Sequence, residues 1–172
     1  AGAVVMAFPG LTMVEERWIR GSSDFPYVPG LLSFREIPHI LNVLGQLKNE
    51  PDLFLCDGQG IAHPRGLGLA SHLGLITQKP SIGCAKTRLV GEYAQVEYDR
   101  GSRSDLLYRG RKVGMVLRTK KGVKPIFISP GYGVTAGQAV EIVLKCTGKY
   151  RLPEPIRKAH LLVNRARREE EG

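Results

Sequence analysis

Short continuous apolar runs punctuate the first half of the chain and predict strands. They lie at residues 3–8, 11–19, 52–57 and 81–85. The last two have the composition of buried central strands. The run at 52–57 ends on Asp57, and the run at 81–85 is followed by Lys86. Because catalytic groups of open α/β sheets gather at the carboxyl ends of strands, this edge is the predicted place for a site.

Helical spacing appears between and after these runs. Apolar residues recur every three or four positions after Ser33, the expected N-cap, with Pro38 in the first turn and Glu36 at the helix start. Further helices are predicted at 66–76, 135–146 and 155–168. Short strands joined by basic turns are predicted at 93–98, 106–108, 112–118 and 125–128. The pattern indicates an α/β protein.

The size and composition fit one domain spanning residues 1–172. The 172 residues are 42% hydrophobic, enough to close a single core. A signal peptide and a membrane span are not expected, because no basic region precedes the apolar start and no apolar run is long enough. Cys56, Cys84 and Cys146 lack metal-ligand spacing and are expected to be buried reduced thiols, which favours the cytoplasm.

The net charge of +9 is concentrated in the second half of the chain. Residues 1–99 carry 8 basic and 10 acidic side chains, whereas residues 100–172 carry 17 and 6. A basic surface of this kind attracts polyanions, since each Lys or Arg placed on a phosphate releases counterions. A solvated face that keeps the protein in solution has the same composition, so charge alone does not decide between the two.

Asp57 is a candidate metal ligand. Phosphodiester hydrolysis uses a divalent cation, usually Mg²⁺, held by carboxylate oxygens. Asp57 follows an apolar run and precedes Gly58 and Gly60, which allow the backbone to approach a ligand closely. Asp-Gly pairs are more often simple turns, but the apolar loop that follows, with His63 and Arg65, is unusual for a surface turn.

Lys86 and Tyr27 are the other candidates that the residues themselves suggest. Lys86 follows a buried run and could neutralise a scissile phosphate, although a surface lysine is the blander alternative. Tyr27 lies in a stiff proline-flanked loop that would hold its ring in a fixed exposed position. Such a ring can wedge into a duplex from which a base is extruded, or it can be a packed loop residue. His39 and His72 are interpreted as structural.

Three motifs closely resemble those of the endonuclease V family, the deoxyinosine-specific repair nucleases. They are PYVPGLLSFRE at 26–36, DGQGIAHPR at 57–65 and GCAK at 83–86. The segment RLPEPIR at 151–157 is similar to the C-terminal signature of that family. Matches of this length are far more specific than a lone glycine pattern. The resemblance implies a ribonuclease H-like fold with a central mixed β-sheet flanked by helices.

The resemblance also implies roles for individual residues. The catalytic group would comprise Glu36, Asp57, Lys86 and His160, with Asp57 and Glu36 binding Mg²⁺ (Mn²⁺ being a potential substitute) and Lys86 contacting the phosphate. Tyr27 would be the wedge in the DNA, with Pro29 beside it. The pocket for the lesion base would be formed by Gly30, Leu32, Gly58, Gly60, His63, Gly68, Gly83 and Leu89.

Two features depart from the family pattern. The family carries its first metal-binding aspartate on a strand that would precede Ala1, and no Asp occurs before Asp24. We therefore expect the domain to lack its first strand in this sequence, with that Asp lying upstream. Tyr132 stands where family members often carry histidine, which argues for a structural role of its loop.

The expected function is a Mg²⁺-dependent DNA repair endonuclease that recognises deoxyinosine and hydrolyses the second phosphodiester bond on its 3′ side. The expected partner is DNA containing deoxyinosine, with a monomeric protein and no membrane. Two alternatives stay open: an endoribonuclease specific for inosine in RNA, and a non-catalytic nucleic-acid-binding protein if the upstream aspartate is truly absent.

Overall fold

The computed structural model describes residues 1–23 and 25–171, and of Glu170 and Glu171 only the backbone. In chain order the elements are β1 (Gly2–Ala7), β2 (Thr12–Trp18), α1 (Leu32–Leu44), β3 (Phe54–Cys56), α2 (Leu69–Thr77), β4 (Ser81–Ala85), β5 (Arg103–Tyr108), β6 (Arg111–Leu117), β7 (Ile126–Tyr132), α3 (Ala136–Lys145) and α4 (Glu154–Glu171). The described helices include none that is long and apolar enough to cross a membrane.

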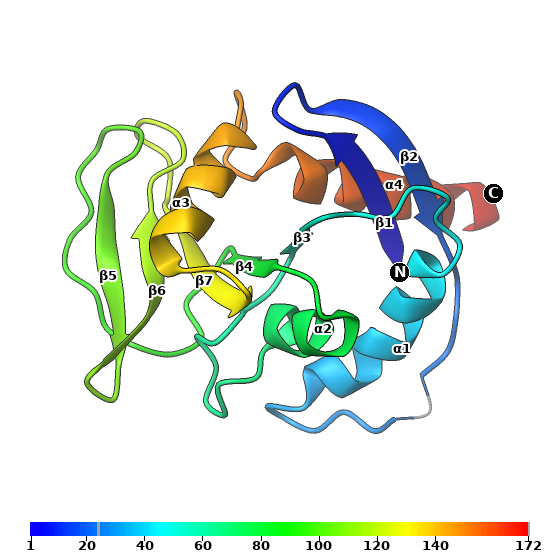
Figure 1. Cartoon of the computed structure of the whole chain (residues 1–172), viewed down its shortest axis with the longest axis horizontal. Helices are drawn as coiled ribbons and strands as arrows, with labels where there is room; N and C mark the ends of the chain where they lie inside the picture. Colours follow the sequence, from blue (N-terminus) through cyan, green and yellow to red (C-terminus); the bar gives the residue numbers. More distant parts are fainter. Residues whose placement is uncertain (24, 172) are drawn as a thin grey trace.

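The central sheet is mixed and has the order β3-β4-β7-β6-β5. β3 and β4 are parallel, and the other neighbours are antiparallel. β1 and β2 form a separate antiparallel hairpin, which packs against α4 and α1 at the opposite end of the molecule from β5 (Figure 1). The prediction of an α/β fold with a mixed sheet flanked by helices is confirmed.

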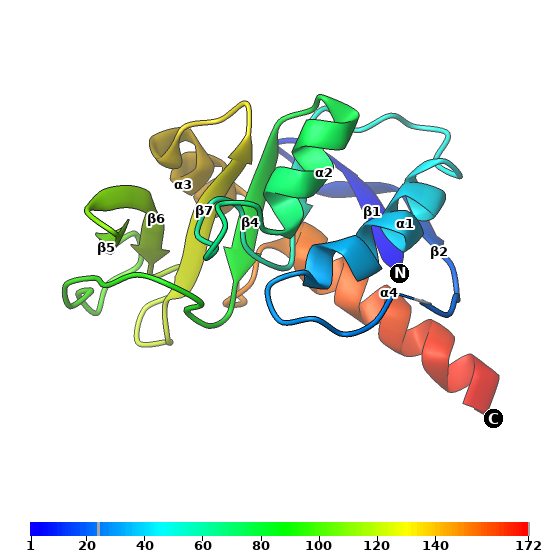
Figure 2. The same cartoon turned by 90° about the horizontal axis from the view of Figure 1, so that it is seen from below.

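Helices cover both faces of the sheet because its strands are apolar on both sides. Ile82 and Cys84 of β4 pack in the same cluster as Val140 and Val143 of α3. Ala85, the next residue along β4, belongs to a second cluster on the other face, as expected from the two-residue period of a strand. α2 packs on β4 and β7, and the far end of α4 extends away from the body of the protein (Figure 2).

Two details of the predicted elements are wrong. α1 begins at Leu32, with Leu31 as an N-cap without a side-chain hydrogen bond, so Pro38 lies inside the helix rather than in its first turn. The hydroxyl of Ser33 instead forms a hydrogen bond with Nδ1 of His72, 3.1 Å away, and does not cap the helix.

The predicted strand at 93–98 does not form. An isolated bridge joins Glu92, the residue before this segment, to Leu107, and two carbonyl groups of the segment accept hydrogen bonds from a side chain. The guanidinium of Arg118 donates hydrogen bonds to the carbonyl oxygens of Val96 and Glu97, at 2.8 and 2.5 Å. These two carbonyl groups are therefore satisfied by a side chain rather than by a neighbouring strand.

Candidate active site

Side chains from four elements converge at the carboxyl edge of β3 and β4. Asp57 follows β3 and Lys86 follows β4, and since the two strands are parallel, their ends lie side by side. The Lys86 Nζ atom is 3.6 Å from Oδ2 of Asp57. α4 brings Nε2 of His160 to 2.5 Å from the same oxygen atom. Residues 103 positions apart in the chain are thus joined at one carboxylate.

Glu36 is the second carboxylate of this group and comes from α1. Its pKa is raised, first by burial and then by the negative charge of Asp57, while Arg35 lowers it. The neighbouring Cys56 thiol is buried, and this burial, followed by the charges of Asp57 and Glu36, raises its pKa to about 12. Both carboxylates therefore act on one small region and raise the pKa of a neighbouring group there.

The two carboxylates are suited to provide some, but not all, of the ligands of a divalent cation. Two carboxylates close enough to raise a pKa provide the hard oxygen donors that Mg²⁺ prefers, and a cation would relieve their repulsion. Over residues 1–23 and 25–171, however, no group of three His, Cys, Asp or Glu side chains could hold a metal ion. Asp57 and Glu36 would thus supply part of the coordination, leaving positions for water and phosphate oxygens, which is common for Mg²⁺.

The negative charge of Glu36, which would help to bind the metal, is predicted to lower the stability of the folded protein. Because the pKa of Glu36 is raised in the folded protein, ionising this carboxyl group costs more free energy there than in the unfolded chain. This loss of stability is absent well below the ordinary pKa of 4.5 and complete above the raised pKa. We expect Glu36→Gln to raise the Tm of metal-free protein at pH 7, with the gain shrinking towards pH 4.

Thermal unfolding in chelator at both pH values measures this effect. Glu141→Gln, on the exposed face of α3, is the matched control. An equal gain at pH 4 and pH 7 would reject a charge-based cause.

A hollow of about 310 Å³ opens beside Asp57 and Lys86. It is lined by Asp57, Gly58, Gln59, Ala85, Lys86, Thr87, Arg88 and Leu89. Gly58 and Leu89 of the predicted base pocket are among these residues. Gln59, Thr87 and Arg88 were not singled out from the sequence, although Gln59 lies between two glycines that were. The side-chain Nε2 of Gln59 donates to the carbonyl of Thr87 at 3.2 Å. Within the described part of the chain, the buried Oε1 of Gln59 lacks a partner.

Gly60, Gly68 and Gly83 are not among the residues that line this hollow, and their part in a base pocket stays a prediction. A Cβ on Gly60 would lie 2.0 Å from the carbonyl oxygen of Pro130, and one on Gly68 would lie 2.4 Å from that of Gln59. A Cβ on Gly83 would lie 2.4 Å from the amide nitrogen of Gly60. These glycines let the loop after Asp57 pack directly on β4 and β7, and so they fix the position of the carboxylate.

The loop before α1 carries the predicted wedge. Tyr27 is 68% exposed, and Val28 and Leu32 near it are exposed too. Gly30 has a φ of +78°, a conformation that the turn between Pro29 and Leu31 requires. Phe34 anchors the loop on α1 by stacking on Phe25 and contacting His72. The wedge and the contributions of Pro29, Gly30 and Leu32 to a pocket remain predictions.

His63 is buried in the loop that follows Asp57. Its Nδ1 accepts a hydrogen bond from the Arg65 amide at 3.2 Å, and its carbonyl accepts one from the Gly66 amide. Burial, followed by the charge of Arg65, lowers the pKa of His63 and favours the neutral ring. The ring is therefore tied to its own loop.

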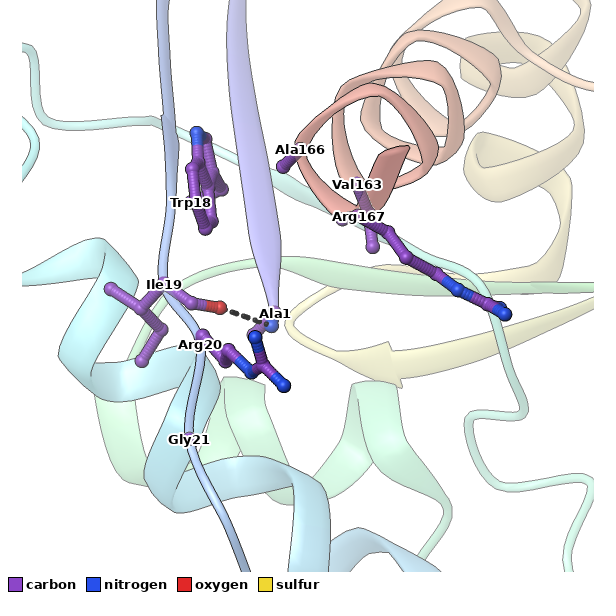
Figure 3. Close-up of a pocket in the computed structure, with 8 residues that line it drawn as sticks. All are labelled: Ala1, Trp18, Ile19, Arg20, Gly21, Val163, Ala166 and Arg167. Atoms are coloured by element: carbon purple, nitrogen blue, oxygen red, sulfur yellow. Dashed lines mark hydrogen bonds between the residues drawn. The ribbon is translucent and has the colours of Figure 1, made fainter. Parts of the chain in front are cut away.

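A second hollow, of about 330 Å³, lies between the β1–β2 hairpin and α4 (Figure 3). Its lining includes Trp18, Arg20 and Arg167, but none of the predicted site residues. The first residue of the sequence forms part of its wall, and the Ala1 amino group donates to the Ile19 carbonyl at 2.9 Å. The candidate active site is therefore the one at Asp57, where the acidic and basic groups converge.

Two carboxylates, an ammonium and an imidazole thus meet at the carboxyl edge of a mixed α/β sheet, and metal-dependent nucleases use groups of these kinds. The sequence model of the family described as Endonuclease V matches residues 1–161. The chain belongs to the endonuclease V family.

Known relatives agree in sequence and in fold. Endonuclease V of Dehalococcoides mccartyi is 52% identical over 161 residues, covering 94% of this chain and 72% of the relative. The crystal structure of endonuclease V from Streptomyces avermitilis has a TM-score of 0.94 and 46% identity, over 99% of this chain and 75% of that one. Ciona intestinalis endonuclease V (D234N), 28% identical with a TM-score of 0.83 over 96% of this chain and 77% of that one, was solved with a 23mer DNA containing an inosine followed by a ribo-adenosine.

Proposed function

We propose that this protein recognises deoxyinosine in DNA and hydrolyses the second phosphodiester bond on its 3′ side, with Mg²⁺ as the metal and Mn²⁺ able to replace it. The observation that carries the proposal is the convergence of Lys86, His160 and Glu36 on Asp57, beside a hollow at the sheet edge. The inosine-containing DNA bound by the Ciona relative supports the choice of lesion.

Each residue has a chemical task in this proposal. The site would gain from Mg²⁺ a Lewis acid for the phosphate and a more acidic water. Asp57 and Glu36 would hold the cation through their oxygens, and His160 would keep the Asp57 carboxylate oriented through the contact at Oδ2. Lys86 lies within reach of the same oxygen and provides positive charge for a non-bridging phosphate oxygen as negative charge develops on it.

The basic second half of the chain supplies affinity that is independent of sequence. Residues 100–172 carry 17 Lys and Arg against 6 acidic residues, so they attract the phosphate backbone. Selectivity then comes from extruding the base, because a mispaired base costs less to unstack than a paired one.

Cleavage of end-labelled strands tests the proposal. A duplex with one deoxyinosine should be cut at the second phosphodiester on its 3′ side, in Mg²⁺ and not in chelator, while the same duplex with adenine should stay intact. Equal cutting of the two duplexes would contradict lesion recognition.

An inosine-specific endoribonuclease is the second candidate, and one observation favours it. The nucleic acid bound by the Ciona relative carries a ribo-adenosine after the inosine. Matched inosine-containing DNA and RNA strands, compared by kcat/KM, distinguish the two candidates.

Tyr27→Ala tests the proposed wedge. Base stacking on an aromatic ring contributes about 1–3 kcal/mol, so the preference for inosine over adenine strands is expected to fall by about tenfold. Metal affinity, measured by titrating Mn²⁺, should stay unchanged. Tyr98→Ala is the matched control, since Tyr98 is 65% exposed but lies in another part of the sequence. Parallel losses of lesion preference and metal affinity would argue against a wedge.

A further inference from the structure

Arg151 lies in the connection between α3 and α4 and binds three backbone carbonyl groups. Its Nε donates to the carbonyl oxygen of Lys124, and its Nη2 donates to those of Pro125 and Lys86, each at 2.8 Å. All three are charge-assisted hydrogen bonds, which are stronger than those between neutral groups. Ion pairs between described residues do not include Arg151, so its charge is directed at the backbone.

These carbonyl groups belong to two segments that meet at the active-site edge. Lys86 comes directly after β4, while Lys124 and Pro125 come directly before β7. The two strands are antiparallel neighbours, and their last pair at this end is Ala85 with Phe127. The hydrogen bonds of the Arg151 guanidinium therefore link the segment after β4 to the segment before β7, just beyond the point where strand pairing stops.

The backbone of Arg151 is itself held in place. Its carbonyl oxygen accepts a hydrogen bond of 2.6 Å from the hydroxyl of Thr119, which is 1% exposed. Pro153, two residues later, is among the fully buried side chains. Because this backbone is fixed, the guanidinium is anchored to the core. Its hydrogen bond can therefore restrict the movement of the carbonyl group of Lys86.

We propose that Arg151 is a positioning residue of the nuclease, which fixes the main chain at Lys86 so that the Lys86 ammonium meets the scissile phosphate. The proposal rests on the function proposed above for Lys86. The planar guanidinium suits this task because it presents several donors in fixed directions, whereas the ammonium of a lysine is a single point at the end of a flexible stem. Small displacements of a catalytic group are costly for the rate.

The protein contains its own control for this proposal. Arg118 also donates to three backbone carbonyl groups, those of Glu97, Val123 and Val96, at 2.5, 2.6 and 2.8 Å. None of these groups belongs to Lys86. Arg118→Met and Arg151→Met hence remove the same kind and number of hydrogen bonds, but only the second removes one from the catalytic segment.

A double-mutant cycle with Lys86→Ala measures whether Arg151 acts through Lys86. Under single-turnover conditions with inosine-containing DNA, Arg151→Met should lower the cleavage rate at least about tenfold, with little change in DNA affinity. Arg118→Met should lower it less than about threefold, and Arg151→Lys should recover only part of the loss. In the Lys86→Ala background, Arg151→Met should cost less than about twofold more. Equal losses in both backgrounds would overturn the proposal.

A measurement on Lys86 itself needs neither metal nor cleavage. Lysines reductively methylated with ¹³C give separate NMR signals, and Lys86→Arg identifies the signal of Lys86. In metal-free protein, Arg151→Met should shift or broaden this signal and leave that of Lys145, on α3, unchanged; Arg118→Met should alter neither. An unchanged Lys86 signal in folded Arg151→Met protein would refute the proposal.

The second measurement also separates this proposal from the proposed function. A shifted Lys86 signal in a protein that does not cut inosine-containing DNA would reject the function and keep the positioning contact. Circular dichroism checks folding, and if Arg151→Met does not fold, the same two measurements are made on Arg151→Lys, for which an unaltered Lys86 signal and an unaltered rate would overturn the proposal.

Discussion

Asp57→Asn is expected to lower kcat/KM for inosine-containing DNA by at least about 10³-fold. The amide keeps the shape of the side chain but removes the charge that Lys86 and His160 contact and that would bind the cation. Affinity for uncut inosine-containing DNA should stay within about threefold, because contacts to the phosphate backbone supply most of it.

Asp105→Asn is the matched control for this change. Asp105 is also a half-exposed carboxylate paired with a lysine, 2.7 Å from Nζ of Lys112, but it lies on β5 away from the site. Its replacement should leave cleavage unaltered. Undiminished cutting by Asp57→Asn in Mg²⁺ would remove Asp57 from the mechanism.

Gly60→Ala is expected to produce the largest loss of stability. Its Cβ would lie 2.0 Å from the carbonyl oxygen of Pro130, a backbone atom that cannot rotate away. The Gly60 amide donates to Ser129 Oγ at 2.7 Å and the Ile61 amide to that Pro130 carbonyl at 2.8 Å, so the loop would have to leave β7. We expect a loss of about 3 kcal/mol, or roughly 6–12 °C in Tm.

Thermal unfolding measures this loss against Gly137→Ala. Gly137 is an exposed residue of α3, where a Cβ would have ordinary contacts only, and alanine favours a helix. Gly137→Ala should therefore leave the Tm unchanged or raise it. Should the two variants unfold at the same temperature, the close packing of the Asp57 loop on β7 would be contradicted.

The sequence predicted the sheet edge more reliably than the groups that reach it from elsewhere. Asp57 and Lys86 each terminate or follow a buried apolar run, and local pattern alone predicts where such residues lie. His160 lies within a basic amphipathic helix and gives no local signal, so only the family resemblance pointed to it. Its contact with Asp57 depends on how α4 crosses the end of β3, which is a property of the whole fold.

Glycines and arginines show a similar limit of sequence reasoning. The glycines around Asp57 indicate close backbone approach, but sequence does not tell whether a ligand or the chain itself approaches. At Gly60, Gly68 and Gly83 it is the chain. The strand predicted at 93–98 does not form, and the carbonyl groups of its Val96 and Glu97 accept hydrogen bonds from Arg118, about twenty positions away. Interactions of this kind become visible only when the chain is folded.

The contact between His160 and Asp57 has a consequence for the synthesis of the protein. The two residues are 103 positions apart, and His160 lies on the last helix of the described chain. A ribosome that has released everything up to β7 has produced Asp57, Lys86 and Glu36, but not the imidazole that contacts the Asp57 carboxylate. In the function proposed above, the nascent polypeptide therefore lacks the group that would orient Asp57 until translation has supplied α4 and the helix has docked.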